Sequence, residues 1–269
     1  MKILMLGDVV GRVGREMVIN NLGILKRELS PDFVIVNGEN ASHGFGITPQ
    51  ICDRFFAAGV DVITTGNHVW DRKEITEILI NDRRVIRPIN LPKNSIGYGY
   101  GIYTKNDKKI AVMLVLGNTF MHPAGLASEA IIDTMRNLEL KRNVDAIVVD
   151  MHADATSEKY CAGHLLDGKV SLVAGTHTHV PTADAHIMSN GTAFICDLGM
   201  CGCYDSVIGM KKDGPVARFV NPINASRFEP ATGNGTICGI FVETDDNTGL
   251  AKSVKQIIYG ATLAPTIAD

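Results

Sequence analysis

A chain of 269 residues is long enough to form one large domain with a sizeable apolar core. Its 45% hydrophobic and 20% charged residues are typical of a globular protein and exclude a fibrous or disordered chain. The formal net charge of -3 argues against a surface that grips nucleic acid, which needs clustered Lys and Arg, but still allows a small anionic substrate.

The first residues form a strand-like run and lack the apolar stretch and cleavage site of a signal peptide. Other apolar runs, such as 110–116, are too short to cross a bilayer. The cysteines at 52, 161, 196, 201, 203 and 238 form no CxxC pair, so we expect reduced thiols, with Cys201 and Cys203 as a solvated loop pair. These features predict a cytoplasmic protein without a membrane partner.

The first half of the chain predicts strands that alternate with helices. Ser30-Pro31 ends the first helix, because proline cannot continue a helix. Thr48-Pro49 starts the second, with a hydroxyl at the cap and a proline in the first turn. The predicted strands are 2–5, 33–36 and 61–64, and the predicted helices are 14–29, 48–58 and one that begins near Asp71.

The second half adds two hairpins to this pattern, which indicates that antiparallel strands join the parallel ones. The predicted hairpins pair 98–103 with 110–116 and 236–242 with 252–258. Between them we expect a helix at 126–141 and strands at 146–149 and 170–173. The chain has no repeat, low-complexity tract or long linker, so we predict a single domain over 1–269 with an α/β sandwich architecture.

Side chains of the kinds that bind metal ions recur where the predicted strands stop. Because ligands bind outside the carboxyl ends of strands in open α/β sheets, five strands would deliver these groups to one rim. The candidate ligands are Asp8, Glu39, Asn40, Asn67, His152, His177 and His179. Oxygen and imidazole ligands without thiolate suit manganese, iron or zinc, and seven are too many for one tetrahedral zinc. They suffice for two ions if one carboxylate bridges them, and such a pair can catalyse phosphoryl displacement.

Two short motifs carry a family resemblance. Gly66-Asn67-His68 and the GTHTH segment at 175–179 resemble the GNH and GHxH signatures of the calcineurin-like metallophosphoesterases. A fuller set resembles their YmdB-like branch: GDVVGRVGR at 7–15, NGENASHGFG at 37–46, GNHVWD at 66–71, RPIN at 87–90, HADATSEK at 152–159, GTHTHVPTAD at 175–184 and DLGMCGCYD at 197–205. The resemblance covers nearly the whole chain and implies a four-layered α/β/β/α sandwich of mixed sheets.

The resemblance also implies a role for each candidate residue. It assigns Asp8, Asn40 and His179 to one ion and Asn67, His152 and His177 to the other, with Glu39 as the bridge. His68 would protonate the leaving oxygen while a bridging hydroxide attacks phosphorus. The family is associated with iron and hydrolyses phosphodiesters, among them 2',3'-cyclic nucleotides. Like the branch that it resembles, the chain lacks the histidine of the usual DxH motif after Asp8. Its one departure from relatives is Asp154, which stands where Glu is usual.

Other readings of the sequence remain open. A regulator that senses metal and nucleotide would also bind ions, and a phosphomonoesterase such as a nucleotidase would use the same ligands. The glycine-rich loop at 7–14 lacks the GxGxxG spacing of a dinucleotide site. His122, His164 and His186 are interpreted as structural, and His43 either lines the substrate entrance or lies on the surface. We expect a small phosphodiester substrate and no stable nucleic-acid partner, and a homo-oligomer is compatible with the sequence.

Overall fold

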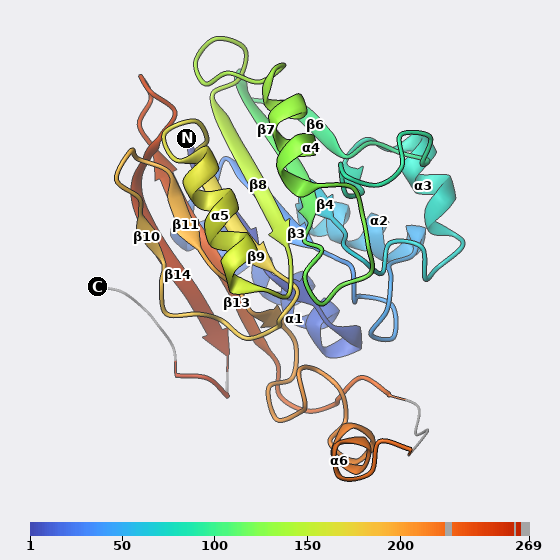
Figure 1. Cartoon of the computed structure of the whole chain (residues 1–269). Coiled ribbons are helices and arrows are strands. Elements are labelled where there is room, and N and C mark those ends of the chain that lie inside the picture. The colour runs from blue at the N-terminus through green and yellow to red at the C-terminus, as the bar shows by residue number, and fades with distance from the viewer. Residues whose placement is uncertain (224–227, 261, 265–269) are drawn as a thin grey trace.

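The computed structural model describes residues 1–223, 228–260 and 262–264. Two mixed six-stranded sheets pack face to face, and helices cover the outer face of each sheet (Figure 1). No helix among these residues is both long and apolar enough to cross a membrane.

The first sheet has the strand order β14-β13-β1-β3-β4-β5. Four of its strands, β1, β3, β4 and β5, run parallel to one another. β13 pairs antiparallel with β1 and forms a hairpin with β14, which lies at the edge. The strands are β1 (Lys2–Leu6), β3 (Phe33–Asn37), β4 (Val62–Thr64), β5 (Val85–Ile86), β13 (Thr236–Thr244) and β14 (Ala251–Gly260).

The second sheet has the order β10-β11-β9-β8-β7-β6. Its middle strands β11, β9, β8 and β7 run parallel, and an antiparallel strand closes each edge. The strands are β6 (Tyr100–Lys105), β7 (Lys108–Leu116), β8 (Ala146–His152), β9 (Leu172–Thr176), β10 (His186–Ile187) and β11 (Ala193–Ile195). A short separate ladder pairs β2 (Asp8–Val9) with β12 (Met200–Cys201).

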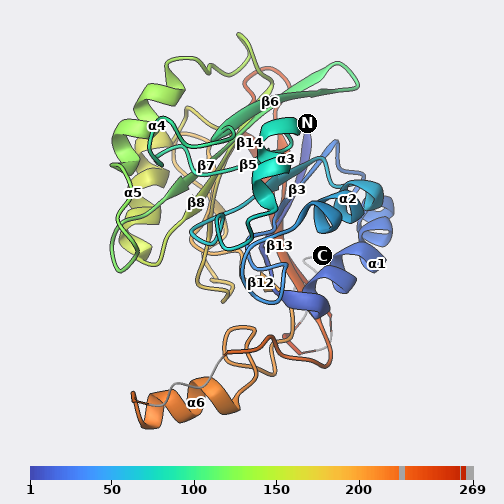
Figure 2. The same ribbon diagram turned by 90° about the vertical axis from the view of Figure 1, so that its right-hand side faces the viewer.

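Alternating side chains of the strands build three apolar layers. In β1, Ile3 and Met5 face the second sheet, whereas Leu4 and Leu6 pack under the helices. Helices α1 (Gly11–Leu29), α2 (Pro49–Ala58) and α3 (Ile75–Asn81) cover the first sheet, and α4 (Ala127–Met135) and α5 (Thr156–Leu166) cover the second (Figure 2). The predicted four-layered α/β/β/α sandwich is confirmed.

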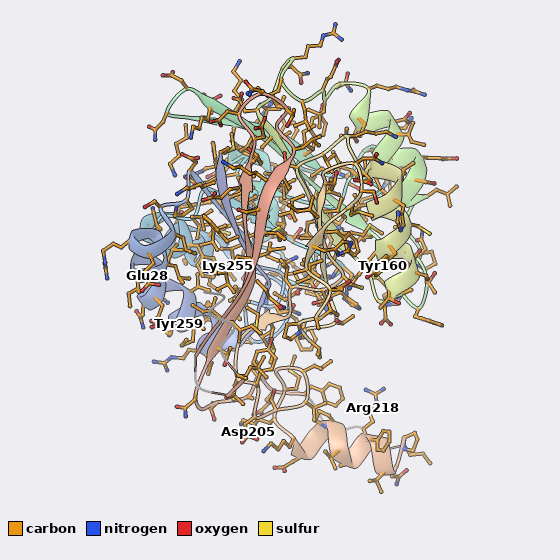
Figure 3. The ribbon with its side chains drawn as sticks, turned by 90° about the vertical axis from the view of Figure 1, so that its left-hand side faces the viewer. Glu28, Tyr160, Asp205, Arg218, Lys255 and Tyr259 are labelled. Carbon is orange, nitrogen blue, oxygen red and sulfur yellow. The ribbon has the colours of Figure 1, made fainter. Side chains whose placement is uncertain are left out.

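One segment projects from the sandwich. We call the described residues of 206–230 the arm; it contains α6 (Asp213–Val220) and has a stem joined by bridges between Val207 and Met210 and between Met210 and Pro230. Figures 1 and 2 show α6 beyond the end of the sheets toward which the β8 arrow points. Figure 3 places Asp205 where the arm leaves the body and Arg218 on α6.

The predicted helix boundaries are wrong in three places. α1 begins at Gly11 rather than at position 14. α3 begins at Ile75 rather than near Asp71, because the residues from Gly66 onward form the turns that follow β4. α4 ends at Met135 rather than at position 141. There the Asn143 side chain accepts from the Glu139 N–H and donates to the Asn137 carbonyl, so it replaces helical hydrogen bonds in the last predicted turns.

Three further expectations differ from the structure. Thr48 occupies the N-cap of α2, but its hydroxyl makes no capping hydrogen bond. Cys201 and Cys203 are buried rather than solvated, because β12 lies against the body and Cys201 Sγ donates to the Cys238 carbonyl at 3.5 Å. α5 was not predicted, since Lys159 lies on its buried face and interrupts the apolar pattern.

Candidate functional site

The predicted ligands gather at one edge of the sandwich because parallel strands of both sheets end there. From the first sheet, Asp8 comes after β1, Glu39 and Asn40 after β3, and Asn67 after β4. From the second sheet, His152 ends β8, and His177 and His179 come directly after β9. Both sheets therefore contribute ligand atoms to the same edge of the fold.

A first group of ligand atoms surrounds His152. Its Nε2 lies 3.0 Å from Glu39 Oε1, 3.0 Å from Asn67 Oδ1 and 3.1 Å from His177 Nδ1. One ring nitrogen carries at most one proton and cannot satisfy three acceptors. Convergent acceptors of this kind favour a cation among them, and ligand atoms of Glu39, His152 and His177 lie within 4.8 Å of one another.

A second group contains Asp8, Glu39 and His179, whose ligand atoms also lie within 4.8 Å of one another. Asn40 Oδ1 belongs to this group, at 3.2 Å from His179 Nε2. Asp8 Oδ1 is buried and has no hydrogen-bond partner, which is costly for a carboxylate unless a cation satisfies it. Glu39 is common to both groups, where a bridging carboxylate would have to be.

The donor set therefore fits two cations, in the grouping that the family resemblance implies. It consists of carboxylate and amide oxygens and imidazole nitrogens, which suit manganese, iron and zinc. Coordination by these seven residues stays a prediction.

Burial and neighbouring charges shift the pKa values of the groups in this cluster. Burial raises the pKa of Glu39, but the charge and hydrogen bond of His152 more than offset this and lower that pKa to about 2. Burial lowers the pKa of His152, but the Glu39 carboxylate outweighs it and raises the pKa to about 9. Burial raises the pKa of Asp8 well above its usual value, a shift that a neighbouring divalent cation would reverse.

The histidine loop after β9 is held in an unfavourable backbone conformation. His177 and His179 have φ angles of 98° and 66°, in the region that favours glycine, which costs about 1–3 kcal/mol at each residue. Asp8 Oδ2 accepts a hydrogen bond from His177 N at 3.2 Å, and Asp197 Oδ2 accepts one from Thr178 N at 3.1 Å. Sequence reasoning missed Asp197, which the fully buried Lys159 holds by an ion pair of 2.7 Å.

Gly66 leaves room for the bridging carboxylate. A Cβ atom at this position would lie 2.0 Å from Glu39 Oε2 and 2.6 Å from His152 Nε2. No real contact is that short, so any side chain here would displace the two ligands. Steric exclusion of any side chain therefore explains why the GNH motif has a glycine at position 66 in this chain.

A buried polar network holds the His152 ring in place on its Nδ1 side. Thr176 donates its hydroxyl proton to Asp150 Oδ1 at 2.6 Å, so it accepts at Oγ1 from His152 Nδ1–H at 2.7 Å. This fixes the tautomer in which Nε2 faces the other ligands. Thr64 and Asn37 from the first sheet donate to Asp150 Oδ2 at 2.6 Å and 3.1 Å. Burial raises the pKa of Asp150, but a carboxyl group with three donors and no acceptor is satisfied as the carboxylate.

The predicted proton donor, His68, lies beside the ligand groups. Its backbone N–H donates to Glu39 Oε2 at 3.2 Å, and its Nδ1 lies 2.8 Å from Asp71 Oδ2. The Asp71 carboxylate accepts Nδ1–H, so Nε2 is the nitrogen left for a substrate. Asp71 therefore orients the ring of the predicted proton donor.

A cavity of about 220 Å³ opens on these groups. One wall is polar and includes Glu39, Asn40, His68, His177 and His179. The rest of the lining is apolar and comes mostly from the arm, which sequence reasoning missed entirely. A larger hollow of about 760 Å³ along 135–143 is lined by no histidine or cysteine of the described residues, so it lacks the chemistry of a metal centre.

The remaining candidates lie outside this centre. His43, His122, His164 and His186 are exposed, and none of them lines the cavity. Asp154, the residue that departs from the family pattern, is also exposed.

Comparison with known proteins places this site in a family. Residues 4–257 match the family described as YmdB-like protein. The 2',3'-cyclic-nucleotide 2'-phosphodiesterase of Bacillus subtilis is 40% identical over 96% of this chain and 97% of its own length. A crystal structure described as a novel phosphatase of Mycoplasma pneumoniae superposes with a TM-score of 0.89 at 35% identity, over 97% of this chain and 93% of that one. For a Thermus thermophilus protein, the TM-score is 0.90 at 32% identity, over 97% and 100% of the two chains. The two ligand groups that share Glu39 thus belong to a chain that is a member of the YmdB-like protein family.

Proposed function

We propose that this chain is a metal-dependent phosphodiesterase that hydrolyses nucleoside 2',3'-cyclic phosphates. The observation that carries the proposal is the pair of ligand groups joined by Glu39, next to a histidine that is not in either group. The activity named for the Bacillus subtilis relative, which matches this chain over almost its full length, agrees with this chemistry.

We assign Asp8, Asn40 and His179 to one cation, Asn67, His152 and His177 to the other, and Glu39 to both. When bound, the cations supply Lewis acidity and positive charge at the phosphate. The five neutral amide and imidazole groups beside two carboxylates keep the loaded centre positive, which favours an anionic diester. We propose iron as the native metal, with manganese and zinc as the ions that the same donor set accepts.

His68 is assigned as the general acid of the reaction. Asp71 orients its ring, and both His68 and the ligands Glu39, His177 and His179 line the same cavity. As the oxygen of water bonds to phosphorus and the ester P–O bond breaks, Nε2 of His68 gives its proton to the departing ribose oxygen, which becomes a hydroxyl of the nucleoside monophosphate product. Such proton transfer contributes about 10²–10⁴-fold to a rate.

The test of this assignment separates binding from chemistry. We expect His68→Ala to keep the wild-type metal content and to lose about 10²–10⁴-fold in kcat. The loss should be largest for alkyl esters and small for bis-p-nitrophenyl phosphate, whose leaving group needs no acid. His177→Ala should lose metal and activity together. Normal turnover of an alkyl diester by His68→Ala would refute the proton-donor role.

A phosphomonoesterase is the second candidate, since a structural relative is described as a phosphatase. Rates on a 2',3'-cyclic nucleotide and on the corresponding nucleoside monophosphate decide between the two. Metal analysis of protein purified without added metal gives the identity of the ions and their number per chain. We further propose that the whole chain acts as one domain in the cytoplasm on a small nucleotide.

A further inference from the structure

The cavity has an apolar wall that the metal chemistry does not require. Six apolar residues form it: Phe45, Val207, Ile208, Met210, Pro215 and Phe228. All except Phe45 belong to the arm, which Figures 1 and 2 show projecting from the end of the sandwich. The arm therefore lines the cavity together with the candidate metal ligands.

Two contacts fix the arm relative to the metal centre. The Ile208 carbonyl accepts a hydrogen bond from His179 Nδ1 at 2.8 Å, so an arm residue orients a candidate ligand directly. The loop after β3 packs against the same stem, since a Cβ at Gly44 would lie 2.8 Å from Met210 Cε and 3.2 Å from Pro230 Cγ. These contacts hold the apolar wall of the arm at a fixed distance from the candidate ligands.

The backbone of Ile208 is held in an unfavourable conformation. It has a φ of 44°, a conformation that is unfavourable for a β-branched residue, and its side chain is 52% exposed beside the cavity. An apolar side chain held in this way next to a polar site is typical of a surface that a ligand covers.

The position of His68 indicates which part of a substrate meets this wall. The His68 ring packs edge-on against Phe45, with centroids 5.1 Å apart and an interplanar angle of 73°. A proton donor acts on the leaving-group side of phosphorus. In a nucleoside 2',3'-cyclic phosphate the leaving oxygen belongs to the ribose, which also carries the base. The ribose and base therefore extend from His68 toward Phe45 and the arm.

We propose that Ile208, Pro215 and Phe228 of the arm bind the base of the nucleotide, so that the arm selects nucleotides over simple phosphodiesters. This inference rests on the proposed phosphodiesterase function and names the part of its substrate that the arm contacts. The side chains of this wall contact a base through its faces, as aromatic and apolar surfaces do for any base. None of them carries a polar atom, so the wall accepts adenine, guanine, cytosine and uracil with little discrimination.

Phe228→Ala tests the proposal on two substrates. One is adenosine 2',3'-cyclic phosphate, and the other is methyl β-ribofuranoside 2,3-cyclic phosphate, which has the same reacting group but no base. We expect Phe228→Ala to raise KM for the nucleotide about tenfold, or about 1.4 kcal/mol, with kcat unchanged, because the base contact is equal in ground and transition states. KM for the base-free ester should not change.

Two further variants provide controls. Phe228→Trp keeps an aromatic face and should retain the low KM for the nucleotide. Val216→Ala removes an apolar side chain of α6 that is 50% exposed and does not line the cavity, so both substrates should react normally. Equal KM values of the wild-type chain for the two substrates would overturn the inference and leave the phosphodiesterase function intact. A similar loss on both substrates in Phe228→Ala would overturn it too. Failure of the wild-type chain to hydrolyse either ester would refute the proposed function and this inference with it.

Discussion

The hydroxyl of Thr176 should set the metal affinity of the centre, although it binds no metal itself. It accepts from His152 Nδ1–H at 2.7 Å and donates to Asp150 Oδ1 at 2.6 Å. Thr176→Val keeps the shape of the side chain and removes both hydrogen bonds. His152 then loses the acceptor that fixes its tautomer, and loss of such a support typically lowers metal affinity about 10–100-fold.

The same substitution should also destabilise the fold. It leaves a buried imidazole N–H and one carboxylate oxygen of Asp150 without a partner, and each such group costs about 1–3 kcal/mol. The expected loss in the free energy of unfolding is therefore about 2–6 kcal/mol. Urea unfolding without metal measures this term, and competition for Mn²⁺ with a chromophoric chelator measures the affinity.

Two control variants make the result specific. Thr176→Ser keeps the hydroxyl and should retain most of the Mn²⁺ affinity. Thr236→Val makes the same change at a buried hydroxyl that has no hydrogen-bond partner, so neither affinity nor stability should fall. If Thr176→Val bound Mn²⁺ as tightly as the wild-type chain, the role given to the Asp150–Thr176–His152 chain would be wrong.

Two further predictions follow from single contacts. Gly66→Ala should abolish metal binding, measured as metal content, because its Cβ would lie 2.0 Å from Glu39 Oε2. Gly23→Ala in α1 is the control, since its Cβ would meet its nearest atom at 3.8 Å. This variant should bind metal normally, and its free energy of unfolding should rise by up to about 1 kcal/mol. Asp32 has a pKa below its usual value: burial acts to raise it, but hydrogen bonds from Lys108 and a backbone N–H outweigh burial. Its contribution to stability is therefore present above pH 3.8 and lost as the pH falls through the lowered pKa. Asp32→Asn should be less stable than the wild-type chain at pH 7 in urea unfolding, and a difference that persisted undiminished at pH 2 would contradict the assignment.

The sequence located most of the candidate ligands because the signal for each of them is local. A ligand that directly follows an apolar strand is placed at the sheet edge by the strand itself, so Asp8 and Glu39 could be located without tertiary contacts. His152 and His177 were predicted on the same grounds, and the structure brings these residues together as expected. The parallel pairing of β8 with β9 places His152 opposite Thr176, and this brings the ends of the two strands to the same edge of the sheet.

The support of the centre was missed because its signals are weaker. Asp150 and His152 lie on one face of β8, so a carboxylate two residues before a ligand in an apolar strand was a usable sign. The pairing of Asp197 with Lys159 spans 38 positions and has no such sign. α6 has no buried residue, so no burial pattern predicted the arm or its wall of the cavity.

The candidate ligands divide between the two sheets, with Asp8, Glu39 and Asn67 on one side and His152 and His177 on the other. Cations bound there would join two layers whose other contacts are mainly apolar. Each tenfold rise in free metal above the dissociation constant would then add about 1.4 kcal/mol per site to the stability of the sandwich. A cell starved of the metal would lose the polypeptide as well as its activity, because a more frequently unfolded chain is degraded sooner.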